Sequence, residues 1–335
     1  MKIRALSLVL CVVMIITSLV FVSCKNVNED EKEINISVLN GTTGFGIAKL
    51  MDDVKNDKSS LSNVNFTVET DAANITAGLI NGSIDIAALP TNAAANLYNK
   101  TVGKIKIAAV NTLGVLYVVV NTENVNYGAG IIDFEFLKGK TVYCPAQNPA
   151  FIFTALCEAN GLEVGKDVII DTAYAQPADL RSAIVSGKVE IAVLPEPMVT
   201  IAKNANQSIN TVMDLTSEWD KVFDEGSLMQ GCIVVRTEWL ENNQETFDKF
   251  MSEYKASIEF VNTNADEAAA MISTHKIFEN KVVAQKAIPN CNIKYVDGDE
   301  MAAGLDKLFS VLYSVAPASI GNKLPDSGIY YKNEK

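Results

Sequence analysis

Histidine is nearly absent from this chain of 335 residues, which contains only His275. One imidazole leaves no pair for a two-histidine metal site, and any histidine-activated nucleophile would depend on that residue. Basic residues are also in deficit, with 28 Lys and Arg against 40 Asp and Glu and a net charge of -12. Because non-specific nucleic-acid binding relies on neutralising phosphates, we expect no nucleic-acid partner.

Several short motifs that carry chemistry are missing as well. The sequence has no P-loop, no G-x-G-x-x-G, no C-x-x-C and no H-E-x-x-H, the patterns that indicate phosphate, dinucleotide, thiol-exchange and zinc sites. We therefore predict no catalytic residue, no metal and no cofactor. Beyond residue 24 the cysteines are widely and irregularly spaced, unlike a small disulfide scaffold, and we expect free, buried thiols at Cys144, Cys157, Cys232 and Cys291.

The N-terminus has the layout of a signal peptide. Lys2 and Arg4 precede an apolar run over residues 5–22, which ends at Ser23-Cys24. A basic start followed by such a run is typical of export signals. We expect residues 1–23 to be the signal and residues 24–33 a polar tether, so that the remaining chain lies outside the cytoplasm.

The end of the run resembles the bacterial lipobox, in which Cys24 would be lipidated and would anchor the protein to the membrane. The family prefers leucine three residues before the cysteine, and Phe21 stands there. The alternatives are an uncleaved anchor helix and an ordinary secretory signal followed by an incidental cysteine.

An internal repeat indicates two lobes of similar plan. Residues 75–95 read ITAGLINGSIDIAALPTNAAA, and residues 180–202 read LRSAIVSGKVEIAVLPEPMVTIA. Glycine, acid, isoleucine, leucine and proline recur in both at an offset of about 105 residues, and the same offset places residues 36–39 on 141–144. The period is far longer than the ~20–50 residues of solenoid repeats.

Short apolar runs alternate with helical patterns in each half, which favours an α/β protein with parallel sheets covered on both faces. The first half predicts strands at 34–39, 65–69, 84–89, 105–109 and 115–121, with helices at 46–55, 72–81 and 92–100. The second half predicts strands at 141–144, 168–171 and 190–194, with helices at 150–160, 177–186 and 197–204.

The last third, residues 237–312, reads as amphipathic helices without intervening strands and predicts a cap on the first lobe. The chain must cross between lobes twice. We expect residues 116–121 and 231–236 to lie side by side as a two-strand hinge, with Asn121 and Gln230 as hinge residues. The first lobe would then comprise residues 34–120 and 231–335, and the second residues 121–230.

Ligands of doubly wound sheets bind beyond the carboxyl ends of the strands, near helix N-termini. Five loops qualify here: 40–45, 90–92, 111–114, 145–149 and 195–197. Threonine and asparagine at these places could instead serve as simple helix caps, and Glu196 could owe its position to the helix dipole alone. Six aromatic residues lie near these loops: Phe45, Tyr117, Tyr143, Phe151, Phe153 and Tyr174. We expect at most two or three of them to face a ligand.

The segments at 82–87, 137–142, 192–197 and 233–236 carry a family resemblance. From about residue 34 to 272 the chain resembles the substrate-binding lipoproteins of ABC importers in the nitrate/sulfonate/taurine and thiamine-precursor (SsuA-like) group. The resemblance implies a type II periplasmic-binding-protein fold, in which two α/β lobes joined by a two-strand hinge close on one small molecule. It also implies delivery to an ABC permease driven by a cytoplasmic ATPase, and we expect a monomer.

By family position the ligand would contact Thr42, Thr43, Gly44, Phe45, Thr91, Asn92, Thr112, Gln147, Asn148, Ala150 and Glu196. The implied ligands are a sulfonate, nitrate, taurine or a heterocyclic vitamin precursor. Glu196 and the tyrosines favour a neutral or cationic heterocycle. Two alternatives stay open: an enzyme on the same fold, of the pyrimidine-precursor synthase or dehydratase type, and a ligand sensor without transport.

Overall fold

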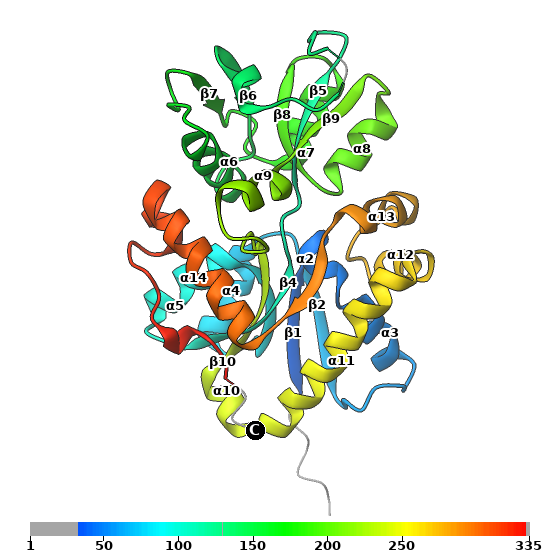
Figure 1. Ribbon diagram of the computed structural model, residues 1–335. Helices are drawn as coiled ribbons and strands as arrows, with labels where there is room; N and C mark the ends of the chain where they lie inside the picture. Colours follow the sequence, from blue (N-terminus) through cyan, green and yellow to red (C-terminus); the bar gives the residue numbers. More distant parts are fainter. Residues whose placement is uncertain (1–32, 129, 333–335) are drawn as a thin grey trace, which may run out of the picture. The chain divides into compact units, whose positions relative to one another are not determined.

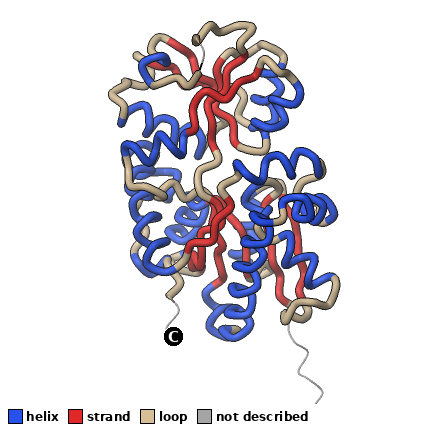
Figure 2. Tube along the Cα trace, turned by 45° about the vertical axis from the view of Figure 1, so that its right-hand side comes forward, coloured by secondary structure: helices blue, strands red, loops and turns tan. Residues whose placement is uncertain are grey.

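The computed structural model describes residues 33–128 and 130–332. The expected signal peptide, Cys24 and nearly all of the tether therefore lie outside the described residues. Residues 34–335 form one compact unit that contains two mixed sheets, flanked by helices (Figures 1 and 2). No helix in the described ranges is long and apolar enough to span a membrane.

The first sheet has six strands in the order β11-β4-β10-β3-β1-β2. Strands β1, β2 and β3 are parallel, whereas β10 is antiparallel to both of its neighbours. The strand bounds are β1 Ile34–Leu39, β2 Val64–Glu69, β3 Ile86–Pro90, β4 Ile105–Thr112, β10 Gly231–Arg236 and β11 Ile293–Val296. The helices of this lobe are α2 Thr42–Phe45, α3 Ala48–Lys55, α4 Ala72–Asn81, α5 Thr91–Thr101, α10 Thr237–Asn242, α11 Gln244–Thr263, α12 Ala265–Thr274, α13 Lys281–Ala287 and α14 Gly298–Val315, with single turns η3 Ile288–Asn290, η4 Pro317–Ile320 and η5 Ser327–Ile329.

The second sheet has five strands in the order β7-β6-β8-β5-β9. Here β5 is the antiparallel strand, between β8 and β9. The bounds are β5 Leu116–Asn121, β6 Lys140–Tyr143, β7 Val168–Asp171, β8 Ile191–Pro195 and β9 Ile209–Asp214. The helices are η2 Phe134–Leu137, α6 Asn148–Ala159, α7 Pro177–Val185, α8 Met198–Ala205 and α9 Leu215–Val222.

The two sheets confirm the prediction of two lobes of similar plan. Reading β2-β1-β3-β10-β4 against β7-β6-β8-β5-β9 gives the same strand order, and the repeated segments form the corresponding strands β3 and β8. The repeated glycines have the same role, because Gly82 and Gly187 follow helices α4 and α7 with φ of 83° and 73°. Glycine adopts this left-handed conformation at no steric cost, because it has no Cβ atom.

The hinge prediction is wrong in its pairing. Residues 116–121 form β5 of the second sheet and residues 231–236 form β10 of the first, so the two runs do not pair. The reason is that an uninterrupted apolar run suits a central strand, buried on both faces. The chain crosses just before each of these strands.

Of the two expected hinge residues, only Gln230 lies at a crossing. Its backbone N–H donates to the carbonyl of Thr112 at 3.0 Å, and its side-chain Oε1 accepts from the backbone N–H of Val115 at 2.8 Å. Asn121 lies at the opposite end of β5, fully buried, where its Nδ2 donates to the carbonyl of Ile184 at 3.2 Å. Gln230 therefore ties the outgoing and returning segments together.

The C-terminal cap is also not purely helical. Strand β11, at the edge of the first sheet, pairs with β4 in an irregular register. The strand has only four residues, IKYV, and lies between long segments with a helical pattern, which is why the sequence did not predict it. The amphipathic helices expected in this segment are confirmed, among them α11 and α12.

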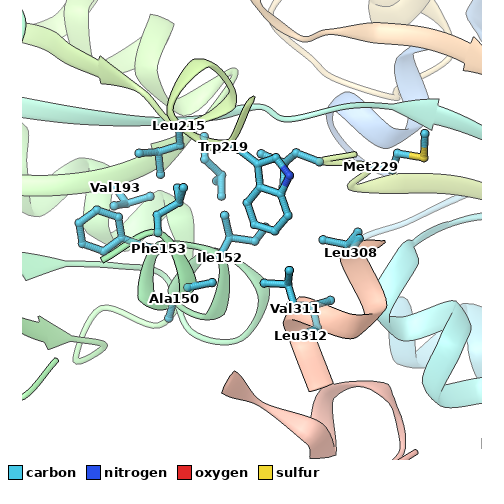
Figure 3. Packing of buried hydrophobic residues seen from close by; sticks show 14 of the residues in the cluster. Ala150, Ile152, Phe153, Val193, Leu215, Trp219, Met229, Leu308, Val311 and Leu312 are labelled. Atoms are coloured by element: carbon cyan, nitrogen blue, oxygen red, sulfur yellow. The ribbon is translucent and has the colours of Figure 1, made fainter. Parts of the chain in front are cut away.

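An apolar contact joins the lobes beside the crossings (Figure 3). Leu308 and Leu312 of α14, in the first lobe, lie in one buried cluster with Ile152 of α6 and Trp219 of α9, in the second. Trp219 is fully buried, and its indole N–H donates to the Ser227 hydroxyl at 2.8 Å. One core cluster thus extends through both lobes.

Truncation on α14 should measure this contact. We expect Leu308→Ala to lower the free energy of unfolding by about 2–5 kcal/mol, because it leaves a cavity in a packed core. Tyr313→Ala on the same helix, where the side chain is 43% exposed, should change it by only about 0.5 kcal/mol. Urea denaturation would check both values, and equal losses would contradict the packing described.

Candidate functional site

Helices α5 and α6 begin close to the gap between the lobes. Each follows a strand of its own sheet, and no side chain among the described residues caps either N-terminus. The first-turn N–H groups of a helix have no partners within the helix, and its N-terminus carries partial positive charge. The Thr91 N–H already donates to the Gln230 carbonyl at 3.1 Å, and Pro149 in α6 has no N–H, so only the other first-turn N–H groups of these helices can donate to a bound group.

A pocket of about 670 Å³ brings the two helices together. We call it the α5–α6 pocket. Asn92 and Leu97 line it from the first lobe, whereas Gln147 and Phe151 line it from the second. The remaining lining residues come from α4, α5 and η4: Asp71, Ala72, Ala73, Thr76, Ile80, Ala93, Asn96, Lys100, Ala318 and Ser319.

Buried polar atoms without partners gather at this pocket. Asn92 is 8% exposed, and its Oδ1 has no hydrogen-bond partner among the described residues. The hydroxyl of Ser319, another lining residue, also has no partner in the described ranges; Oδ1 of Asn148 has none either, but Asn148 does not line the pocket. Because buried polar groups are normally hydrogen-bonded, a bound molecule is a natural partner for them.

A second pocket, of about 360 Å³, surrounds Glu196. We call it the Glu196 pocket. The carboxylate is 4% exposed; Oε2 accepts from the Thr200 N–H at 3.1 Å and Oε1 from the Thr200 hydroxyl at 3.0 Å. Thr200 lies in the first turn of α8, whose N-cap residue is Pro197, so Glu196 accepts hydrogen bonds from that turn while also lining a pocket. The other lining residues are Tyr117, Val199, Thr200, Lys203, Asn204, Thr211, Lys286 and Asn290.

Two hydrogen bonds cross between the lobes at the Glu196 pocket. The Tyr117 hydroxyl, from β5, donates to the carbonyl of Asn290 at 2.9 Å. The Lys286 ammonium, from α13, donates to Oδ1 of Asn204 at 3.2 Å. In each pair one partner belongs to the first lobe and the other to the second, so a change in the distance between the lobes would break these hydrogen bonds.

Three threonines expected at the ligand have hydrogen-bond partners within the protein. The Thr91 hydroxyl donates to the carbonyl of Met229 at 2.7 Å, and the Thr112 hydroxyl donates to Oδ1 of Asn111 at 3.0 Å. The Thr43 carbonyl accepts from Nδ2 of Asn111 at 3.0 Å. Neither pocket is lined by any of these threonines.

Four other expected residues line neither of the two pockets. Phe45 is fully buried, and Ala150 is 7% exposed in the main core cluster. Gly44 lies so close to the Leu39 carbonyl that a Cβ atom there would be 2.2 Å from the oxygen. Thr42 is the first residue of α2, without a side-chain cap there. The structure thus brings Asn92 together with Gln147 and places Glu196 in a separate pocket.

Of the nearby aromatic residues, Phe151 and Tyr117 line pockets. Phe45 and Phe153 are fully buried, and Tyr143 packs against Tyr174 at 6.0 Å between ring centroids. The sequence analysis missed Ser319, Lys203 and Lys286 as pocket residues. Ser319 lies in η4 after α14, between Pro317 and Gly321, and only the three-dimensional packing of η4 on α5 brings it to the pocket.

The four thiols in the described ranges are free and buried, as expected. Burial raises the pKa of Cys144 well above its usual value, and that of Cys157 to about 12. Neutral thiols of this kind are poor nucleophiles. In the same ranges no group of three or more histidine, cysteine or acidic residues could hold a metal ion.

Burial of Glu196 should be visible in the pH dependence of stability. Desolvation raises the pKa of its carboxyl, although the Thr200 hydrogen bonds oppose the shift. Because the folded state holds the proton more tightly than the unfolded state, the contribution of this group to stability falls as pH rises above the unfolded pKa of about 4.5. We expect the wild type to lose stability relative to Glu196→Gln between pH 4 and 7.

Denaturant titrations at several pH values would measure that difference. Glu190→Gln, at an exposed residue in the same lobe, is the matched control and should show no such trend. A stability difference between wild type and Glu196→Gln that stays flat or grows in favour of the wild type with pH would contradict the burial of this carboxylate.

Comparison with known proteins gives matches at the level of structure only. No protein-family model and no curated protein sequence matches the chain. A protein of Parabacteroides distasonis described as an ABC transporter is similar with a TM-score of 0.74 and 24% identity, over 90% of this chain and 99% of that one.

Two sulfonate-binding proteins have the same fold at lower identity. The periplasmic aliphatic sulphonate binding protein SsuA of Escherichia coli gives a TM-score of 0.68 and 14% identity, over 87% of this chain and 95% of that one. The alkanesulfonate-binding protein SsuA of Xanthomonas axonopodis pv. citri, bound to MOPS, gives a TM-score of 0.62 and 11% identity, over 88% of this chain and 94% of that one. The chain thus has the periplasmic binding protein fold, as predicted.

Proposed function

We propose that the protein is an extracytoplasmic solute-binding protein, anchored through a lipid on Cys24, that captures a small molecule and delivers it to an ABC importer. The observation that carries the proposal is the α5–α6 pocket. It joins Asn92 of one lobe to Gln147 of the other and holds buried amide and hydroxyl atoms without partners. The similarity of fold to ABC binding proteins supports the same function.

Capture follows from the division of the pocket between the lobes. The first lobe supplies twelve of the fourteen lining residues and the second supplies Gln147 and Phe151, so a ligand gains the second lobe's contacts only when the lobes approach. The ligand shifts the population toward that arrangement by its difference in affinity. The crossings at residues 112–116 and 227–231 are the places where the backbone would bend. Five of the expected ligand residues would not contact the ligand in this pocket but would hold the surrounding segments in place: Thr42, Thr43, Gly44, Thr91 and Thr112.

The chemistry of the α5–α6 pocket favours an organic anion. Two helix N-termini without side-chain caps attract negative charge, while Ile80, Leu97 and Phe151 offer apolar surface. A volume of about 670 Å³ suits an organic molecule better than nitrate. We therefore favour a sulfonate with an apolar body over nitrate or taurine.

The structure weakens the argument for a cationic heterocycle. That expectation depended on Glu196 and the nearby tyrosines, with Glu196 as a carboxylate that faces the ligand. Both of its oxygens accept hydrogen bonds from Thr200, and it lies in a different pocket from Asn92. A heterocyclic vitamin precursor remains the second ligand class to test.

The enzyme alternative finds less support. His275 lines neither pocket and lies 3.6 Å from the Asp52 carboxylate. The ABC and sulfonate-binding neighbours are named as transporter or binding proteins. A sensor without transport would use the same pocket, and uptake of labelled ligand by cells with and without the gene would distinguish it from an importer.

A thermal-shift screen would test ligand class directly. At about 100 times its dissociation constant, an alkanesulfonate should stabilise the protein by about 2.7 kcal/mol. Asn92→Ala should weaken its binding roughly tenfold or more, since it removes a buried hydrogen-bonding partner. Asn242→Ala, an exposed change on α10, should leave binding unaltered. Stabilisation by aminopyrimidines or nitrate alone, or full affinity in Asn92→Ala, would contradict the assignment.

Trp219 offers a reporter of lobe movement. The chain has two tryptophans, and Trp239→Phe would leave only Trp219, which lies at the apolar contact between lobes. We expect a saturating sulfonate to change its fluorescence emission, because closure alters the packing around the indole. Unchanged emission alongside a clear thermal shift would mean that the ligand binds without moving the lobes.

A further inference from the structure

A pocket of about 690 Å³ lies within the first lobe and shares no lining residue with the two pockets described above. We call it the tyrosine pocket. It opens to solvent and is lined by residues of α11, β4, β11, the start of α14 and the C-terminal segment 330–332. Since every wall belongs to one lobe, its geometry does not depend on the distance between lobes.

Three tyrosines form the walls of this pocket: Tyr295, Tyr330 and Tyr331. Two of them are fixed through their hydroxyls. The Tyr330 hydroxyl donates to Oδ1 of Asp306 at 2.5 Å, and the Tyr331 hydroxyl donates to Oδ1 of Asp248 at 3.3 Å. The Tyr331 ring also packs edge-on against Phe247, with 5.2 Å between centroids. The rings are therefore held in defined positions.

The pocket already accommodates an ammonium group. Nζ of Lys255 lies 5.4 Å from the centroid of the Tyr295 ring, within the range of an attractive cation–π contact. Three aspartates line the pocket against two lysines, so its charge is acidic: Asp248, Asp297 and Asp299 against Lys255 and Lys332. Ala108, Met251 and Ala302 add apolar surface.

We propose that the tyrosine pocket binds a small organic cation, an ammonium group on a compact apolar body, at a site separate from the α5–α6 pocket. Aromatic faces stabilise such a cation through their negative quadrupole, and the carboxylates supply long-range attraction. Its volume is in the range of small-molecule sites. The Lys255 ammonium occupies the Tyr295 face when the ligand is absent, so the two cations compete.

Calorimetric titration of the full chain with choline tests this site. Choline should bind with one molecule per chain, and its uncharged isostere, in which carbon replaces the nitrogen, should bind roughly tenfold more weakly. Lys255→Met removes the competing ammonium and should tighten choline binding several-fold. Lys249→Met makes the same charge change on α11, where Lys249 pairs with Glu245, and should give no comparable gain. Tyr295→Leu should abolish binding.

The proposal is overturned if choline and its isostere bind equally, if both lysine variants gain equally, or if neither the wild type nor Lys255→Met binds choline. Choline binding that disappears in Asn92→Ala would place the cation between the lobes and would also overturn it. Choline binding in a chain that binds no sulfonate would uphold the cation site while the proposed function fails.

Discussion

Each sheet of this protein is completed by a strand from the other half of the chain. Strand β5 leaves the first half to lie between β8 and β9, and β10 returns from the second half to lie between β3 and β4. Neither sheet is continuous without its exchanged strand. The exchange forces two crossings close together, and Gln230 hydrogen-bonds to both ends of the outgoing one. In two lobes that share strands in this way, any change of lobe separation would have to bend the backbone at those crossings.

The position of the candidate site follows from the same constraint. In both sheets the parallel strands lead toward the crossings, so the helices that follow them begin at the gap. Helices α5 and α6 consequently present two helix N-termini without side-chain caps to one pocket, with Asn92 buried between them. Burying an amide without a partner costs stability. A site that accepts this cost in the free protein recovers it when a ligand supplies the missing hydrogen bonds.

Much of the fold could be predicted because it is encoded in local patterns. The repeated Gly-x-x-acid-Ile segment gave β3 and β8 with the same offset, and the long helices α11 and α12 were found from their periodicity. The hinge could not be placed this way. An apolar run such as residues 116–121 looks the same whether it bridges two lobes or fills the centre of a sheet, and only its pairing with β8 and β9 decides.

The site was predictable only in part, because long-range partners decide which side chains are free. Asn92 and Thr91 are neighbours in the sequence, but their surroundings differ. The Thr91 hydroxyl donates to the backbone carbonyl of Met229, 138 residues further along the chain, whereas Asn92 lines the pocket. Likewise Phe151 lines the pocket and Phe153 is core, two positions apart on α6. Ser319 reaches the pocket through the packing of η4 on α5, which no local pattern indicates.

The most direct test of the account is a crystal structure of the protein with an alkanesulfonate. We expect density for one ligand in the α5–α6 pocket, with hydrogen bonds from both Asn92 and the start of α6. A sulfonate held by one lobe alone, or a gap between the lobes filled by the protein's own side chains, would contradict the central claim that both halves bind a single molecule.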